Sequence, residues 1–232
     1  MLWMLLACTF GYQEDGDLTT ISVEQTKSTH HYNYDNPVKS SLRIVSMNSD
    51  HEKNGHGSGN YFKIGKYKFI LTAAHLVTSE DTLWAEDEKQ YVFLYPVYVD
   101  NENDVAILVP SLDLEGPKAV NYKINNKENL TGLSVVYAGY PADSDLSLFN
   151  GMVSSCSKKF CTMQAFALPG ASGSVIFDNG GRVIGLVSAV KMGYNGMSPF
   201  PEMYPSLVYL ARANKLKRDK IKELLIKWKD LK

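Results

Sequence analysis

The stretch LPGASGSVIFDNGGRVIG, residues 168–185, places Ser172 between glycines at a turn and then continues as a short apolar strand. The residues DNGG, at 178–181, separate that strand from the next apolar run. Short runs of Val, Ile and Phe bounded by Gly, Asn and Asp are typical of β-strands. Glycine and serine also dominate ordinary turns, so the meaning of Ser172 depends on what the rest of the chain supplies.

The same pattern recurs along most of the chain from residue 41 onward. Runs rich in Val, Ile, Tyr and Phe, most of them bounded by turn residues, are SLRIVSMN, NYFKIGKYKFILTAAHLV, QYVFLYPVYV, DVAILVP, LSVVYAGYP, GMVSSC, FCTMQAFAL, SVIFD and GRVIGLVSAV. Many short strands with turns between them predict an all-β antiparallel sandwich or barrel. Only residues 214–231 carry apolar residues near helical spacing, which predicts one closing helix.

Changes in composition divide the chain into four segments. Residues 1–40 comprise an apolar N-terminus and, over residues 9–40, a polar arm that is interpreted as a tether or a surface arm. A polar, turn-rich stretch, SLDLEGPKAVNYKINNKENLTG, separates two strand-rich halves, 41–118 and 119–213, each the size of a small barrel. Residues 214–232 form the basic amphipathic helix. No internal repeat is evident.

Charge and composition exclude several classes of protein. With 232 residues, 44% of them hydrophobic, and a formal net charge of −1, the chain has the composition of a soluble globular protein and no global field that would attract nucleic acid. The basic C-terminal segment has two interpretations. The favoured one is a helix packed by one face with its lysines in water, and the other is a helix that reaches an anionic membrane or a nucleic acid.

The cysteines bear on the cellular compartment. Leu5-Leu6-Ala7-Cys8 is similar to a bacterial lipobox, which would attach a lipid at Cys8 and hold the protein at a membrane; an apolar N-terminal strand or a start codon placed too far downstream is an equal alternative. Cys156 and Cys161 flank the residues SKKF, so two strands joined there would bring both side chains within disulfide reach in an oxidising compartment. No metal site is expected, because no cysteine or histidine pair stands at zinc-ligand spacing.

A serine nucleophile requires a general base and a group that orients the base. His75 follows a strongly apolar strand, KFILTAA, and would by itself be interpreted as a core histidine. Asp104 lies between a polar turn and the apolar run VAILVP, where a carboxylate is costly unless it is paired. His75, Asp104 and Ser172 therefore supply, in this chain order, the side chains of a Ser-His-Asp triad.

The successive landmarks resemble those of the trypsin-like (chymotrypsin-fold) serine proteases. The landmarks, which span roughly residues 41–213, are Gly57-Ser58-Gly59, FILTAAHLV, NDVAILVP, GYP, GMVSS and PGASGSVIFDNGGRVIGLVSA. The compact bacterial branch, with the high-temperature-requirement proteases and the glutamyl endopeptidases, is the most similar, and phages also encode such proteins. The resemblance implies two antiparallel six-stranded β-barrels of the chymotrypsin type, followed here by the C-terminal helix.

The same resemblance implies a serine endopeptidase that works through an acyl-enzyme. Ser172 would be the nucleophile, His75 the general base and acid, and Asp104 the group that orients His75. The backbone N–H groups of Gly170 and Ser172 would form the oxyanion hole. The substrate is then a peptide or protein, and no cofactor is expected, because the sequence has no His-Glu-x-x-His cluster, phosphate loop or dinucleotide fingerprint.

Substrate-binding residues follow from the same resemblance. Phe166 and Ala167 would line the base of the pocket for P1, the substrate residue before the scissile bond, with Ala189 and Val190 as its wall. The backbone carbonyl of Ser188 would accept a hydrogen bond from the substrate chain. None of these residues is charged, which predicts a small or medium aliphatic P1.

One position departs from the trypsin pattern. Trypsins carry an Asp directly before the nucleophile, and its pairing with a newly cut N-terminus switches on the oxyanion hole. Ala171 occupies that position here. We therefore expect activity without a defined N-terminal cut.

Alternatives to the enzyme remain open at the level of sequence. A trypsin-like barrel that has lost catalysis would act as a binding module, and a surface or virion component would use the barrels as a scaffold, because fold does not fix function. The disulfide and the lipobox favour an extracytoplasmic location, periplasmic, lipid-anchored or secreted. A cytoplasmic, phage-encoded protein is the alternative.

Overall fold

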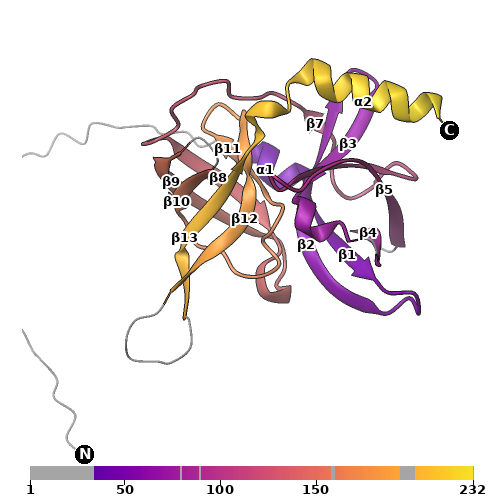
Figure 1. Ribbon diagram of the computed structural model, residues 1–232. Coiled ribbons are helices and arrows are strands. Elements are labelled where there is room, and N and C mark those ends of the chain that lie inside the picture. The colour runs from indigo at the N-terminus through magenta and orange to yellow at the C-terminus, as the bar shows by residue number, and fades with distance from the viewer. Residues whose placement is uncertain (1–33, 79, 89, 158–159, 194–201, 232) are drawn as a thin grey trace, which may run out of the picture. The chain divides into compact units, whose positions relative to one another are not determined.

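Two closed β-barrels make up most of the described chain (Figure 1). The computed structural model describes residues 34–78, 80–88, 90–157, 160–193 and 202–231. Each barrel has six strands, and every neighbouring pair within a barrel is antiparallel. The predicted fold class is confirmed.

The first barrel is closed by a long strand that pairs on both sides. Its strands are β1 (Ser41–Met47), β2 (Lys53–Ile64), β3 (Tyr67–Thr72), β4 (Thr82–Asp87), β5 (Gln90–Asp100) and β6 (Val105–Pro110). They pair in the order β1-β4-β5-β6-β3-β2, and β2 pairs again with β1. A short strand, β7 (Val120–Asn121), adds to β2 in parallel, so residues just beyond the predicted boundary at 118 still pair with the first barrel.

The second barrel has the order β10-β13-β12-β11-β8-β9 and closes through the pairing of β9 with β10. Its strands are β8 (Ser134–Gly139), β9 (Ser147–Cys156), β10 (Phe160–Gln164), β11 (Val175–Asp178), β12 (Val183–Gly193) and β13 (Glu202–Arg212). The quoted stretch that contains Ser172 therefore leads into the β11–β12 hairpin.

A disulfide joins the two strands that close the second barrel. Cys156 of β9 and Cys161 of β10 are direct register partners and are bonded to each other. The loop between them is short enough that the strands keep both side chains on the same face, as the spacing of the two cysteines predicted.

One apolar core extends across both barrels. Phe62 of β2, Tyr122 and Phe177 of β11 are each at most 1% exposed. The Phe62 ring lies edge-on to Tyr122 with 5.4 Å between centroids, and 6.0 Å from the ring of Phe177. Burial of rings of this size supplies much of the stability of a domain, so the two barrels are packed together by their largest side chains.

The closing helix packs against this core by one face. The 3-10 turn η3 (Ala213–Lys215) precedes α2 (Arg218–Asp230), so the helix begins a few residues later than the sequence predicted. Ile221 and Leu225 are 0% and 2% exposed and belong to the shared core. The Tyr122 hydroxyl donates a hydrogen bond to the Leu216 carbonyl, 2.9 Å away, just before the helix. The interpretation of a packed helix with solvated lysines is confirmed.

Leu225→Ala is expected to lower the free energy of unfolding by about 2–5 kcal/mol, because it leaves a cavity under α2. Leu231→Ala is the matched control, since the Leu231 side chain is 86% exposed and its loss is expected to change stability by less than about 0.5 kcal/mol. Urea unfolding of both variants measures the difference. Equal effects of the two substitutions would contradict the packing of the helix.

The end of the polar arm is more ordered than its composition predicted. Residues 35–40 form a short helix, α1 (Asp35–Ser40), in which Pro37 and Ser40 are buried. The buried Asn60 side chain of β2 donates to the Ser40 hydroxyl at 2.9 Å and accepts the Val175 N–H at 2.8 Å. Polar residues are ordered here because each finds a partner in a buried network.

The structure does not test the predicted lipid attachment near the N-terminus. Cys8, the predicted lipid-attachment residue, lies outside the described residues. In the part of the chain that the structure describes, no helix is long and apolar enough to cross a membrane.

Candidate active site

His75 and Asp104 are in direct contact, and both follow or precede strands of the first barrel. His75 lies in η1 (Ala74–Leu76), a 3-10 turn shortly after β3, and Asp104 occupies the turn that leads into β6. The His75 Nδ1 atom lies 3.0 Å from both carboxylate oxygens of Asp104, and the His75 backbone N–H donates to Oδ1, also at 3.0 Å. Because a carboxylate can only accept a hydrogen bond, this contact favours the tautomer with the proton on Nδ1. The imidazole Nε2 is then the nitrogen that can accept a proton.

A second strand from the other barrel also reaches Asp104. The Ser188 hydroxyl of β12 donates a hydrogen bond to Oδ2 of the carboxylate. Burial raises the pKa of Asp104, but the hydrogen bonds from His75 and Ser188 outweigh it, and the pKa of the carboxyl lies below its usual range. Asp104 is therefore ionised at neutral pH, and it is held by side chains from both barrels.

Ser172 lies on a turn that is anchored to the first barrel. The Ser172 carbonyl accepts the Ser58 N–H of β2 at 2.8 Å, and the Gly173 N–H donates to the Val187 carbonyl at 2.7 Å. Gly173 has a φ of +87°, and a Cβ there would collide with the Ser58 carbonyl and the Thr72 hydroxyl. The turn therefore requires glycine at 173 both for its backbone angle and for the close contact with β2.

Two backbone N–H groups on this turn have no hydrogen-bond partner among the described residues. Within the described part of the chain, neither Gly170 nor Ser172 donates its backbone N–H to another residue. Among the same described residues no hydrogen bond joins the Ser172 hydroxyl to His75, a contact that in free enzymes is often loose and tightens with bound substrate. Unpaired N–H groups beside a serine can bind a developing oxyanion.

The arrangement agrees with a family assignment. A family model described as a trypsin-like peptidase domain matches residues 57–186. The chain belongs to the trypsin-like peptidase family. The resemblance seen in the sequence is thereby confirmed.

Individual relatives of this trypsin-like peptidase are distant. A probable periplasmic serine endoprotease DegP-like from Pseudomonas putida (strain W619) is 25% identical over 184 residues, which cover 75% of this chain and 38% of the relative. The protein of the same name from strain GB-1 is 26% identical with the same coverage. The chain thus spans less than half the length of these curated relatives.

Solved structures share the fold. The serine endoprotease from Yersinia pestis superposes with a TM-score of 0.62 at 18% identity, covering 84% of this chain and 65% of that one. The active form of a protease from M. tuberculosis gives a TM-score of 0.59 at 20% identity, covering 78% of this chain and 81% of that one. The HtrA-type protease AlgW with a tripeptide gives a TM-score of 0.64 at 17% identity, covering 83% of this chain and 62% of that one.

The predicted substrate-binding residues of the peptidase do not all line one hollow. Ser188 and Ala189 border a hollow of about 280 Å³ beside Asp104. Val190 packs partly against the core of the second barrel. Ala167 is fully buried, and the Phe166 ring, 46% exposed, lies 6.0 Å from that of Phe149 on β9. The hollow beside Asp104 is lined instead by residues that include an aromatic pair, Phe160 and Tyr209.

Ser58 makes contacts at the site that the sequence analysis did not predict. Its hydroxyl donates to the Gly170 carbonyl at 2.7 Å and accepts the Tyr140 N–H at 3.0 Å, while its carbonyl accepts the Thr72 hydroxyl at 2.7 Å. The signal was present in Gly57-Ser58-Gly59, because a small polar residue between glycines allows two strands and a turn to approach one another closely.

Proposed function

We propose that this chain is a serine endopeptidase with Ser172 as nucleophile, His75 as general base and acid, and Asp104 as the group that orients His75. The observation that carries the proposal is the contact of His75 Nδ1 with both Asp104 oxygens at 3.0 Å. The His75 side chain is 45% exposed, so a substrate can reach the ring. Membership of the trypsin-like peptidase family supports the same activity.

In the first half of the reaction, the Ser172 oxygen attacks the carbonyl carbon of the substrate while His75 Nε2 takes the hydroxyl proton. The negative charge that develops on the carbonyl oxygen is stabilised by the N–H groups of Gly170 and Ser172. When the tetrahedral intermediate collapses, the C–N bond breaks and His75 returns the proton to the leaving amine. The products of this half are the acyl-enzyme on Ser172 and a free amine.

In the second half, water replaces the amine. His75 takes a proton from water while the water oxygen attacks the ester carbon; the tetrahedral intermediate then breaks its C–O bond to Ser172, releasing the acid, and His75 returns the proton to the Ser172 oxygen. Asp104 stays ionised throughout, since its hydrogen bonds keep the pKa of its carboxyl below the usual range, and it stabilises the imidazolium. No step requires a cofactor.

The substrate is a peptide or protein with a small or medium aliphatic P1 residue. Phe166, Ala167, Ala189 and Val190 carry no charge that would pair with a Lys, Arg or Glu side chain. The Ser188 carbonyl would bind the substrate backbone next to the scissile bond.

An extracytoplasmic location fits this activity. The Cys156–Cys161 disulfide requires an oxidising compartment, and relatives of the chain are named as periplasmic endoproteases. Lipid attachment at Cys8 is part of the same proposal. Since Ala171 offers no carboxylate to a cut N-terminus, the oxyanion hole forms without proteolytic activation.

Labelling with a fluorophosphonate probe, which reacts only with an activated serine, tests the proposal. The folded wild-type protein is expected to be labelled, and both Ser172→Ala and His75→Ala are expected to abolish labelling, because the nucleophile and its base act as a unit. Circular dichroism of each variant checks that the fold is retained. Absence of labelling in folded wild-type protein would refute the proposal and favour a binding module.

A further inference from the structure

The backbone turn before Ser172 can exist in two forms, and only one of them suits an oxyanion hole. The Ala171 N–H donates to the Leu168 carbonyl at 3.0 Å, which closes a β-turn over Pro169 and Gly170. Gly170 has a φ of +94°. Proline at the second position and a positive φ at the third are the signature of a type II turn.

The turn by itself does not select this form. A type I turn keeps the hydrogen bond from Ala171 to Leu168 and accepts proline at the same position. Glycine at the third position removes the steric cost of a positive φ and can also adopt a negative φ, so Gly170 makes the type II form accessible without excluding the type I form. The two forms differ mainly in the Pro169–Gly170 peptide plane, which is rotated so that its N–H and C=O exchange sides.

One hydrogen bond distinguishes the two forms. The Ala142 N–H donates to the Pro169 carbonyl at 2.7 Å. Because C=O and N–H point to opposite sides of a trans peptide, holding this carbonyl toward Ala142 directs the Gly170 N–H away from Ala142. In that orientation the Gly170 N–H makes no hydrogen bond to any described residue.

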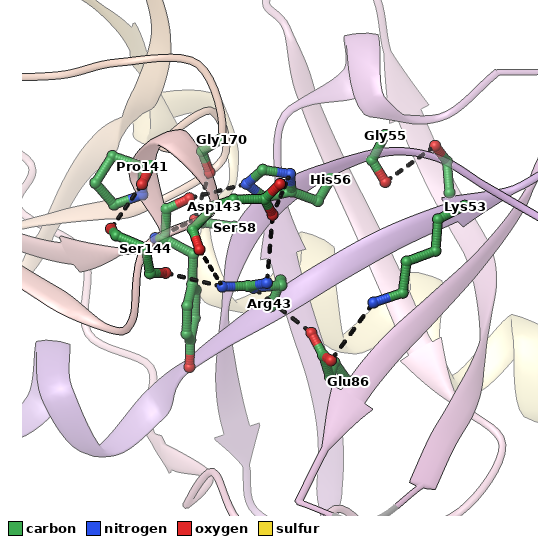
Figure 2. A network of polar contacts seen from close by, with 12 residues as sticks. Arg43, Lys53, Gly55, His56, Ser58, Glu86, Pro141, Asp143, Ser144 and Gly170 are labelled. Atoms are coloured by element: carbon green, nitrogen blue, oxygen red, sulfur yellow. Dashed lines mark hydrogen bonds and ion pairs between the residues drawn. The ribbon is translucent and has the colours of Figure 1, made fainter.

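Ala142 lies in a strained turn, η2 (Pro141–Asp143). Ala142 and Asp143 have φ values of +48° and +60°, in the left-handed region that non-glycine residues seldom adopt. Each such residue costs roughly 1 kcal/mol or more, so η2 needs outside contacts to keep this shape. Figure 2 shows where they come from: Arg43 lies between η2 and Glu86.

Arg43 and His56, both from the first barrel, make these contacts. Arg43 of β1 donates to the Ser144 carbonyl at 2.8 Å, lies 3.5 Å from an Asp143 carboxylate oxygen and is itself paired with Glu86 at 3.5 Å (Figure 2). The His56 ring of β2 reaches the Tyr140 carbonyl with Nε2 at 3.0 Å and the Asp143 carboxylate with Nδ1 at 3.5 Å.

His56 also contacts the turn that contains Gly170. A Cβ on Gly170 would collide with His56 Nε2 and with the Tyr140 carbonyl, so the glycine backbone lies directly against the histidine ring. The turn at residues 168–171, η2 and the first barrel are therefore in contact with one another.

We propose that Arg43, assisted by His56, is a positioning residue for the oxyanion hole. By holding η2 in its strained shape, it keeps the Ala142 N–H on the Pro169 carbonyl and so keeps the Gly170 N–H directed at the oxyanion. These contacts take the place of the Asp that trypsins carry at the position of Ala171. The inference rests on the proposed function for its catalytic consequence, but the link between Arg43 and Ala142 can be measured without catalysis.

Arg43→Met tests the link, because methionine keeps an apolar stem beside the Tyr140 ring and removes the guanidinium that contacts Asp143 and Ser144. Complete loss of one oxyanion donor costs about 10²–10³-fold in kcat. We expect partial loss of the turn geometry to lower both kcat and the fluorophosphonate labelling rate by about tenfold or more, with KM changed less than about twofold. Amide hydrogen exchange at Ala142 is expected to accelerate by at least about tenfold as its hydrogen bond opens.

Lys53→Met is the matched control. Lys53 pairs with the same Glu86, at 3.6 Å, but none of its interactions among the described residues is with η2. The Lys53→Met variant is expected to keep the wild-type values of amide exchange at Ala142, of kcat and of the labelling rate. Unchanged Ala142 exchange in Arg43→Met, or equal changes in both variants, would overturn the inference. A wild-type protein that is not labelled would refute the proposed function, and the exchange result alone would then decide the inference.

Discussion

Ser172→Ala is expected to lower kcat for peptide hydrolysis by about 10⁶-fold, an effect as large as that expected for His75→Ala. The substitution removes the atom that attacks the substrate, and neither His75 nor the oxyanion N–H groups supply another nucleophile. Adding His75→Ala to Ser172→Ala is expected to lower the rate little further, because the two residues act in one step. Steady-state cleavage of a peptide substrate with an aliphatic P1 residue measures both effects.

Ser174→Ala is the control for this experiment. Ser174 is fully buried close to Ser172, and its hydroxyl has no hydrogen-bond partner among the described residues. Removing an unpaired buried hydroxyl is expected to leave kcat within about twofold and to leave stability equal or higher. If Ser174→Ala reduced kcat as much as Ser172→Ala, the assignment of the nucleophile would be wrong.

Asp104→Asn is expected to lower kcat by about 10⁴-fold while KM changes little. An asparagine at 104 can donate its amide N–H to His75 Nδ1, which places the histidine proton on Nε2. That tautomer cannot accept the Ser172 proton. Asp113→Asn is the matched control, since Asp113 pairs with Lys68 at 2.7 Å, outside the candidate site, and is expected to keep full activity.

The same substitution is expected to change how stability depends on pH. The folded pKa of Asp104 lies below the value of about 3.9 that Asp has in an unfolded chain, so the unfolded state binds more protons in acid. The stability that ionised Asp104 contributes is therefore present above about pH 4 and is lost as pH falls through the folded pKa. Asp104→Asn is expected to lose less unfolding free energy than wild type between about pH 5 and about pH 3, measured by urea denaturation. An identical slope in both proteins would contradict the pairing.

Much of the fold could be predicted because it is written in local patterns. The apolar runs bounded by turns correspond to strands such as β6 and β11, and the near-helical spacing of Leu224, Leu225 and Trp228 corresponds to α2. Boundaries and local order at the segment ends differ from the prediction. The pairing of Val120–Asn121 with β2 and the order at α1 depend on partners distant in the sequence, which local composition does not reveal.

The candidate site was predictable for the residues that supply reacting groups. His75, Asp104 and Ser172 stand beside recognisable strand and turn signals, and their chemistry requires those residue types. The contacts of Arg43, His56 and Ala142 were not predictable. Arg43 meets Ser144 across 101 residues of sequence, and the Ala142 contact uses a backbone N–H that every residue except proline carries.

The sequence by itself thus determined which segments form strands, the order of the landmarks and the identity of the reactive groups, because periodicity and residue type are local properties. Only the tertiary structure decided which peptide planes face which way. The direction of the Gly170 N–H depends on one hydrogen bond from Ala142, and that bond exists because side chains of the first barrel hold a strained turn of the second. A turn that glycine leaves free to adopt two forms is fixed by its neighbours in space, and those neighbours appear only once the barrels have packed.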